Sequence, residues 1–539
     1  MTESKNNHER RRSYLELQEL LGRYCTTKNL SPYPTTTRTL PRRRRTGTVG
    51  DDDTDRSNNN NTIWTQEDTE AVIQENNISF DKYLGLRFYH SDPVEFIRAH
   101  SKDNLFIDYE FCVHEKFTVS LKINHEKEER DLVPGIITPQ NFQDLTSSNQ
   151  PKRIQNALYF MDVATIGGYN LSTLRSNEKW YWKRGSEMST DDRHRIFASS
   201  SSSIRPQNVI QGRIGNCGFC SGFASLAAQF PEVIRSAFSF DEKKKSGALS
   251  IRLYPNRKKR FLLLDDYLLC TTMTTNDTRR RRMHSSSSLL FPSPSLHSLN
   301  EYDLWIRLLE KAFVKIQSSY ASLDGYYKWN SLFRHPARAL QLLTGAPLAL
   351  ELHYNHQKQN IDEIYRVLVG TEGRCARIAH GRKKYMGLRS GHGYSLLWVG
   401  TIAGFKLACV RNPHGKGSYT GEFGRGRKSS WSTPNALAVA RELEKRNDDD
   451  DNLSSLAYLR GLLLPLKKED NGIFLIGFDV FVQCFPIISI VGPIVTEKKK
   501  NQLPSTPLPE LPNSCLHILR NKNISHLRSM LNAASSLSD

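Results

Sequence analysis

The sequence predicts an α+β fold, because helix-like and strand-like segments alternate through the centre of the chain, from about 176 to 490. In "EYDLWIRLLEKAFVKIQSSYASL" (301–323), apolar residues recur every three to four positions, which is typical of an amphipathic helix. The compact apolar run in "KKRFLLLDDYLL" (258–269) indicates a buried strand. A chain of 539 residues is long enough for two or three domains.

Three further stretches predict local elements. "FASLAAQF" (223–230) continues a helix, which Pro231 helps to end. "GFKLACVRNP" (404–413) and "NGIFLIGFDVFVQCF" (471–485) predict further strand and helix. Alternating apolar residues also predict short strands within 103–126.

Composition divides the chain outside this core. Residues 1–62 form a basic and polar region with too few apolar side chains to fold, so we expect disorder. Residues 63–175 form a small globular region to which the sequence assigns no function, and 491–539 form a C-terminal tail. Within the core, 272–300 and 441–455 are predicted to be surface insertions.

The chain is basic, with 75 Lys and Arg against 56 Asp and Glu. Much of the excess lies in the runs of arginine at 42–45 and 279–282, beside polar low-complexity sequence. Such runs are typical of solvated tails and loops. No nucleic-acid recognition module is visible, so we expect no specific nucleic-acid partner.

Nine cysteines are scattered through the chain. An odd number in a chain of this size favours a reduced, intracellular protein over a disulfide scaffold. The N-terminus lacks an apolar signal segment, and no apolar run approaches the ~20 residues of a membrane helix. We therefore expect a cytoplasmic protein without a membrane span.

Two of these cysteines stand close together in "QGRIGNCGFCSGFA" (211–224), where Cys217 and Cys220 begin a predicted helix. A redox pair would follow a strand, but the preceding segment lacks a strand pattern. A zinc site would need two more ligands, and only Cys375 and His380 stand at a plausible spacing. Neither alternative has further support from the sequence.

A nucleophilic cysteine explains Cys217 better. The start of a helix favours a thiolate, and the glycines around the cysteine permit a tight turn. "SGHGYSLLWVG" (390–400) places His392 at the head of a strand, and "ACVRNPHGKG" (408–417) places Asn412 at the end of another. The order Cys, His, Asn is that of papain-like cysteine proteases.

The motifs together resemble the calpain family, whose protease core is papain-like. "QGRIGNCG" is similar to the family's Q-G-x-x-G-D-C-W, "GHGYSLLWV" to G-H-A-Y-S-V and "VRNPHG" to R-N-P-W-G. "RFLLLDDYLL" resembles its strand ending in paired aspartates, and "DLWIRLLEKAFVKIQSSYASLDG" its long helix. "LLTGAP", "WKRGSEM" and "DNGIFLIGFDVFVQCF" also match family motifs. The matches run in order over roughly 180–486.

The resemblance implies a two-lobed core: a helical nucleophile lobe at 176–345 and a β-rich lobe with the histidine and asparagine at 346–490. It also implies a role for each matching residue. Cys217 would attack the scissile carbonyl, His392 would carry the proton and Asn412 would orient the imidazole. Gln211 would donate to the oxyanion, although alone it could equally be a turn residue.

The chain departs from the family pattern close to the expected nucleophile. Gly218 replaces the tryptophan after the cysteine, Asn216 the aspartate before it, and His414 the tryptophan after Asn-Pro. His414 could be a second titratable group near the site, but we expect a histidine of a surface loop. Cys220 is expected to pack in the core.

The family's calcium-binding carboxylates are also replaced. The matching positions hold Asn208, Ser418, Arg425, Asn471 and Ile473, although a hard cation needs carboxylate oxygens. We expect no metal site and no cofactor, and a core that assembles without calcium.

Two functions follow from the resemblance. The favoured one is a cysteine endopeptidase that cleaves intracellular proteins through an acyl-enzyme. The alternative is a catalytically impaired calpain-like protein that binds partners or acts as a scaffold. Retention of the four matching site residues favours the enzyme, whereas the lost tryptophans and carboxylates keep the alternative open.

Overall fold

The structure is a computed structural model of the whole chain. It describes residues 66–83, 86–100, 106, 108, 110, 180–185, 188, 196–197, 204–212, 215–240, 246–271, 298, 303–317, 323, 336–354, 360–417, 419–425, 428–445, 455–464 and 471–495. The predicted region 1–62, the predicted tail 491–539 from residue 496 onward, most of 103–126 and most of the 272–300 insertion lie outside these residues.

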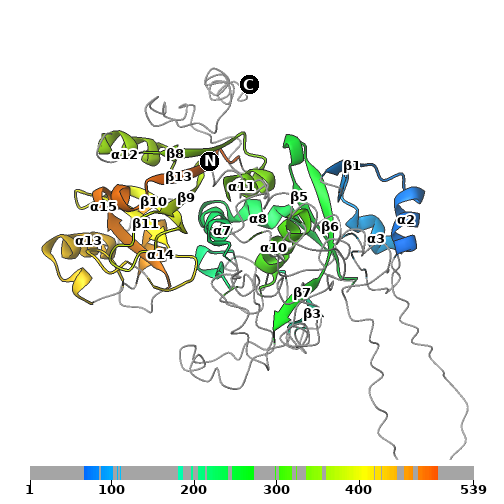
Figure 1. Cartoon of the computed structure of the whole chain (residues 1–539), viewed down its shortest axis with the longest axis horizontal. Coiled ribbons are helices and arrows are strands. Elements are labelled where there is room, and N and C mark those ends of the chain that lie inside the picture. Colours follow the sequence, from blue (N-terminus) through cyan, green and yellow to red (C-terminus); the bar gives the residue numbers. More distant parts are fainter. Residues whose placement is uncertain are drawn as a thin grey trace, which may run out of the picture.

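The fold is α+β, as predicted, with two antiparallel sheets on either side of a central helix, α7 (Cys217–Gln229) (Figure 1). The first sheet has the order β1-β2-β6-β5-β4 and the second the order β12-β11-β10-β9-β13-β8. The strands of the first sheet are β1 (Phe80–Tyr83), β2 (Leu86–Tyr89), β4 (Phe238–Phe240), β5 (Ala248–Leu253) and β6 (Arg260–Asp265). Those of the second are β8 (Leu348–His353), β9 (Ala376–Gly381), β10 (His392–Ile402), β11 (Phe405–Arg411), β12 (Ile473–Gly477) and β13 (Ile487–Gly492).

Helices pack against both sheets, and a two-stranded ladder lies beside the first. α11 (Pro336–Thr344) contacts both sheets, through β5 of the first and β8 and β13 of the second, and η3 (Pro206–Asn208) lies against α7. The elements near the first sheet are α2 (Gln66–Glu75), α3 (Val94–His100), α8 (Pro231–Ala237), α10 (Trp305–Gln317), β3 (Trp180–Arg184), β7 (Tyr267–Thr271) and η4 (Pro255–Arg257). Those near the second are α12 (Ile361–Gly370), α13 (Pro434–Glu444), α14 (Ser455–Leu463), α15 (Phe478–Cys484) and η7 (Lys428–Trp431). No helix in these parts of the chain is both long and apolar enough to cross a membrane.

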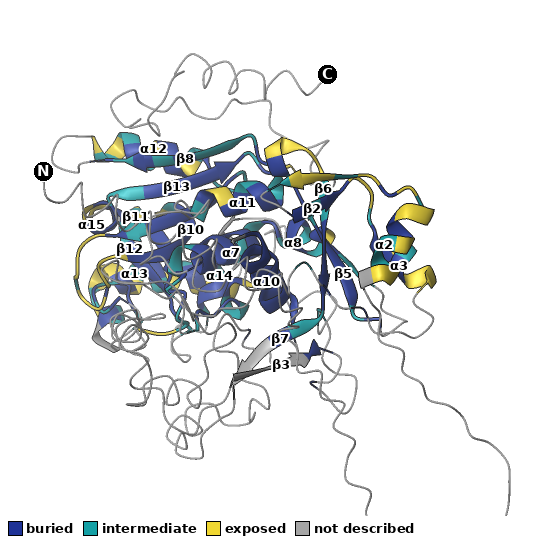
Figure 2. Ribbon diagram, turned by 45° about the vertical axis from the view of Figure 1, so that its right-hand side comes forward, coloured by how far each residue is buried: buried dark blue, intermediate teal, exposed yellow. Residues whose placement is uncertain are grey.

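The central helix α7 is buried around its whole circumference. Its sequence is small and apolar, and every residue from Phe219 to Ala227 is buried (Figure 2). The Phe219 ring lies edge-on to Phe223, with centroids 4.4 Å apart, and to Phe313 of α10 at 5.1 Å. A helix that is apolar on all sides needs neighbours on all sides, which explains its place between the sheets. As expected, Pro231 follows its end and starts α8.

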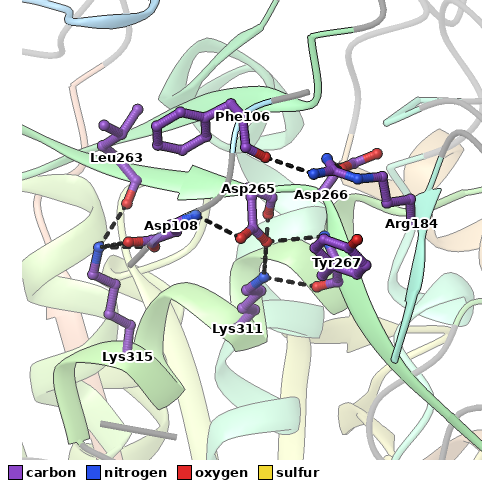
Figure 3. A network of polar contacts seen from close by, with 9 residues as sticks. All are labelled: Phe106, Asp108, Arg184, Leu263, Asp265, Asp266, Tyr267, Lys311 and Lys315. Carbon is purple, nitrogen blue, oxygen red and sulfur yellow. Dashed lines mark hydrogen bonds and ion pairs between the residues drawn. The ribbon is translucent and has the colours of Figure 1, made fainter. Parts of the chain in front are cut away.

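A buried ionic network joins four segments of the chain (Figure 3). Its members are Asp108, Arg184, Asp265, Asp266, Lys311 and Lys315. Lys311 of α10 pairs with Asp265 of β6 and also donates to the Tyr267 carbonyl at 2.7 Å. One turn later, Lys315 pairs with Asp108 at 2.8 Å. The lysines therefore extend the buried face of α10 beyond its apolar stripe.

The other members of the network explain a break in the predicted strand 258–269. The chain turns at Asp266, because the Asp265 carboxylate accepts the Tyr267 N–H at 3.0 Å, while Asp266 pairs with Arg184 at 2.6 Å. β6 therefore stays in the first sheet, whereas β7 pairs with β3. The prediction of a single strand was wrong, because these polar contacts redirect the chain.

The described part of the 63–175 region shares a sheet with the nucleophile lobe. β1 and β2 form a hairpin, and Tyr89 of β2 pairs with Phe261 of β6. Apolar residues of this segment also pack against Ala248 and Leu263 of the first sheet. These strands and the predicted nucleophile lobe are thus physically continuous; the boundaries proposed from composition remain predictions.

In the second sheet, the start of one predicted strand lies beside the end of another. β10 begins at His392, as predicted, and pairs with β11, which ends at Arg411 immediately before Asn412. Ser395 lies opposite Arg411 in this antiparallel register. The stretch 471–485 forms the strand β12 followed by the helix α15. The insertion predicted at 441–455 begins later than expected, since α13 extends to Glu444.

Candidate active site

Cys217 lies where α7 meets the second sheet. It is the first residue of the helix, and its Sγ accepts the backbone N–H of Gly393, the second residue of β10, at 3.2 Å. The positive end of the helix dipole and this N–H both stabilise negative charge on the sulfur. The predicted placement of Cys217 at a helix start is confirmed, and its sulfur lies next to the strand that begins with His392.

Asn216 supports this helix start from below. Its side chain does not cap α7; instead its Nδ2 donates to Glu310 of α10 at 2.8 Å, and its Oδ1 accepts the Cys220 thiol at 3.2 Å. Cys220 is fully buried, and burial raises the pKa of its thiol well above the usual value. Core packing of Cys220 is therefore confirmed, and the structure separates the two cysteines into an accessible and a buried one.

Asn412 has a fixed side-chain orientation. Its Nδ2 donates to the carbonyls of Lys416 at 2.8 Å and Gly417 at 3.1 Å, so its Oδ1 must be the atom facing the other way. That oxygen lies 3.0 Å from His392 Nε2. Because an amide oxygen only accepts, Nε2 carries the proton, and Nδ1 of His392 holds the lone pair.

His392 is largely buried, with 8% of its surface exposed. Burial lowers the pKa of the imidazole to about 4, against a smaller opposing effect of the Asn412 hydrogen bond. The ring also lies edge-on to Tyr394, with centroids 4.9 Å apart. At neutral pH the imidazole is therefore neutral, held in one plane and able to accept a proton at Nδ1.

Gln211 connects the nucleophile lobe to the asparagine loop. It is 7% exposed, and its backbone N–H donates to the carbonyl of Pro413 at 2.9 Å. The structure thus gathers the four predicted residues through three contacts: sulfur to the start of β10, imidazole to Asn412, and Gln211 to the residue after Asn412. Their catalytic roles remain predictions.

Gly218 has no room for a side chain on the first turn of α7. A Cβ built there would stand 2.7 Å from Cγ of Pro336, the first residue of α11. A Cβ on Gly393 would likewise stand 2.9 Å from the Gly218 Cα. Pro336 thus occupies the space toward which a side chain at 218 would point, and the two glycines let α7 and β10 touch.

His414 belongs to the site, although the sequence predicted that it would lie in a surface loop. It is half-buried and its ring stacks on His392, with centroids 4.8 Å apart and planes 28° apart. Its Nδ1 lies 3.2 Å from Asn412 Oδ1. We call His392, Asn412 and His414 the imidazole cluster. The sequence contained one indication of this placement, because His414 lies two residues after Asn412.

The positions that match the family's calcium ligands do not suit a calcium ion. Arg425 donates from Nη1 to Asn471 Oδ1 at 3.0 Å and from Nη2 to the Leu463 carbonyl at 2.5 Å, so a guanidinium already uses the amide oxygen. Asn208 donates to Asp303 at 3.4 Å. The side chain of Ile473 has no ligating atom, and Ser418 lies outside the described residues.

No group of three His, Cys, Asp or Glu side chains in the described part of the chain is placed to hold a metal ion. The two residues considered as zinc ligands, Cys375 and His380, make other contacts. Cys375 is buried beside Gly492, and His380 hydrogen-bonds to the Ser489 hydroxyl at 2.8 Å.

Comparison with known proteins is consistent with this geometry. Residues 159–453 match the model of the calpain family of cysteine proteases. The chain is 26% identical over 231 residues to the calpain-type cysteine protease ADL1 of rice, and 27% identical over 231 residues to DEK1 of maize. It is 26% identical over 203 residues to human calpain-7.

These relatives are much longer proteins. The matched segment makes up 40% of this chain but 9% of each plant protein, and 36% of this chain but 21% of human calpain-7. The likeness therefore concerns a small part of each relative, while the family model covers more than half of the 539 residues. The chain belongs to the calpain family of cysteine proteases.

Proposed function

We propose that the chain is a cysteine endopeptidase that cleaves proteins with Cys217, His392 and Asn412. One observation carries the proposal: His392 is held by Asn412 in the tautomer that leaves Nδ1 unprotonated, while its neighbour Gly393 donates to the Cys217 sulfur. A base with a fixed lone pair beside a partly exposed thiol is the arrangement that nucleophilic catalysis requires.

The reaction follows from these positions. His392 Nδ1 takes the thiol proton, and the Cys217 sulfur attacks the carbonyl carbon of a peptide bond to form a tetrahedral oxyanion. When the C–N bond breaks, the proton passes from His392 to the departing amine and a thioester remains. Water, deprotonated by the same nitrogen, then attacks the thioester, and the acid and the thiol are released.

Gln211 and the start of α7 supply the groups that stabilise the oxyanion. The backbone N–H of Cys217 lies at a helix N-terminus, where the first four N–H groups have no partner within the helix. Gln211 is held against Pro413 and has an amide that can donate to the same oxygen. Loss of one such donor typically lowers the rate by about 10²–10³.

A thiol-directed epoxysuccinyl peptide tests the proposal on the full chain. The sulfur opens the epoxide by forming a C–S bond, and the resulting alkoxide takes a proton from the site. We expect labelling of the wild type and none with Cys217→Ser or His392→Ala. Cys220→Ala is the matched control on the same helix, and it should label like the wild type.

Equal labelling of the wild type, Cys217→Ser and His392→Ala would contradict the proposal. A wild type that stays unlabelled while its Cys217 reacts normally with a small alkylating agent would instead favour the impaired binding protein. The departures at Gly218 and His414 are the observations that keep this second function in view.

We also propose that the core assembles without calcium, because Arg425 already donates to Asn471 at the position of a family carboxylate. A guanidinium is a permanent cation that needs no ion to complete it. Labelling should therefore proceed equally in a chelator and in added calcium. Labelling that appears only after calcium is added would contradict this part of the proposal and leave the nucleophile assignment intact.

A further inference from the structure

Three donors converge on a single oxygen in the imidazole cluster. Asn412 Oδ1 lies 3.0 Å from His392 Nε2, 3.1 Å from the backbone nitrogen of His414 and 3.2 Å from His414 Nδ1. An amide oxygen has two lone pairs and cannot donate, so His414 Nδ1 must carry a proton for this contact to be attractive. His414 therefore has the Nδ1–H tautomer.

The two imidazole rings also restrain each other. His414 stacks on one side of His392 at 4.8 Å, and Tyr394 contacts the same ring edge-on at 4.9 Å. Tyr394 is fully buried, and its hydroxyl accepts the backbone N–H of Arg389 at 2.8 Å. The plane of the His392 ring is thus set by one aromatic neighbour from the core and one from the loop after β11.

The loop that carries His414 is itself held in place. The Asn412 amide donates to the carbonyls of Lys416 and Gly417. Gly415 lies against the side chain of Ile210, since a Cβ placed on Gly415 would stand 3.5 Å from Ile210 Cδ1. The same loop receives the Gln211 N–H through Pro413. The His414 ring therefore belongs to a loop that both lobes fix.

We propose that His414 is a positioning residue for His392: its ring keeps the imidazole in the plane that turns Nδ1 away from Asn412, and its own protonation switches this support off. The inference rests on the proposed function. In its neutral form His414 donates to Asn412 and offers a neutral face to His392. A second proton would place a cation against the ring that must become cationic during the reaction.

The surrounding charges oppose this second proton. The groups that act on His414 are His392 on β10, Arg389 just before that strand, and Lys416 in the same loop. Burial is the main reason that the pKa of His414 is lowered to about 4. His392, Arg389 and Lys416 lower this pKa further. Near neutral pH His414 therefore supports His392, and the support is lost in acid.

Two variants separate the ring of His414 from its donor. His414→Phe keeps a flat ring without a proton to donate or gain, and His414→Asn keeps an amide donor near the position of Nδ1 without a ring. At neutral pH, His414→Phe should label with the epoxide probe within about threefold of the wild type. His414→Asn and His414→Ala should label roughly tenfold more slowly or worse, because small displacements of a catalytic base are costly.

The pH dependence provides the readout that a merely structural role would not move. In the wild type, the logarithm of the labelling rate should fall on the acid side with a slope approaching two, because the reacting pair and His414 each take up a proton. In His414→Phe the slope should approach one. Thermal unfolding of each variant at the assay pH shows that the comparison is made on folded protein.

The outcomes distinguish a failure of the proposed function from a failure of the positioning role of His414. If labelling does not depend on Cys217, the proposed function fails, and the inference fails with it. If labelling depends on Cys217 but His414→Ala matches the wild type in rate and slope, only the inference fails. A His414→Phe variant as slow as His414→Ala, or one with a slope of two, would also overturn the inference.

Discussion

The ionic network and the imidazole cluster are both buried polar systems, but they are built on opposite principles. In the network, three cations meet three carboxylates, and backbone groups satisfy further atoms of the same side chains. In the cluster every group is neutral at neutral pH, and three donors share one oxygen. Saturated charges fix the first lobe, whereas the cluster leaves the His392 Nδ1 lone pair available for chemistry.

The pKa directions reflect this difference. Burial alone would raise the pKa of Asp265, but Lys311 and Arg184 hold it below the usual value. In the cluster no opposite charge offsets burial, so the pKa of each histidine falls to about 4. Asp265 therefore stays charged, and the unpaired imidazoles stay neutral.

Breaking the network should have the largest effect on stability. Lys311→Met leaves the Asp265 carboxylate buried without its nearest cation, so the free energy of unfolding should fall by about 3–5 kcal/mol. Adding Asp265→Asn should recover part of this loss, because the buried charge is then gone. Chemical denaturation of the full chain measures both; a loss below about 1 kcal/mol for Lys311→Met would contradict the assigned role.

The matched change in the cluster is Asn412→Ala. It removes a neutral acceptor and leaves His392 Nε2–H without that partner, which costs about 1–3 kcal/mol. Its labelling rate should nevertheless fall roughly 100-fold, because the tautomer and plane of the base are no longer fixed. Lys311→Met should label normally while folded, and the reverse pattern would erase the contrast between the two regions.

The close approach of α7 and α11 can be tested at Gly218, on the first turn of α7. Gly218→Ala places a methyl 2.7 Å from the Pro336 side chain, so we expect a loss of about 1–3 kcal/mol and slower labelling. Gly461→Ala on α14 is a matched control, since a Cβ there meets nothing within 4 Å; it should stabilise the chain by about 0.5–1 kcal/mol.

Adding Pro336→Ala to Gly218→Ala should restore part of the lost stability by removing the clash. If Gly218→Ala behaves like Gly461→Ala, the close approach of α7 and α11 is not a constraint. Pro336 would then not explain why glycine replaces the bulky family residue at position 218.

Local patterns predicted the parts of the site that local sequence determines. The start of α7 at Cys217, the start of β10 at His392 and the position of Asn412 after β11 all follow from periodicity and turn residues near each position. Chain order then related them to a family. The stacked ring of His414 could not be predicted, because it depends on how the Asn412 amide folds the following loop.

The same limit applies to the long-range contacts. The apolar stripe predicted α10, yet the partners of Lys311 and Lys315 lie 46 and 207 residues away along the chain. Substitution of the calcium carboxylates was visible in the sequence, whereas the bond from Arg425 to Asn471 was not. In each case the sequence shows the residue type but does not show which distant residue it contacts.

The smallest effect, and the one that compares the two systems most directly, is on proton uptake during unfolding. His414 has a lowered pKa, so between about pH 4 and 6.5 the unfolded chain binds its proton and the folded chain does not. This makes stability rise with pH in that window. Asp108 is opposite: burial raises its pKa to about 6, so the folded chain holds the extra proton and stability falls as pH rises from about 4 to 6.

Removal of either group should therefore change the pH dependence of stability in opposite directions. His414→Phe should reduce the protons taken up on unfolding near pH 5 by about one, whereas Asp108→Asn should increase them by up to one. Denaturation midpoints and free energies measured from pH 4 to 7 give both numbers. Shifts of the same sign would contradict this prediction, because burial disfavours the charged form of both groups and so raises the pKa of the carboxyl and lowers that of the imidazole.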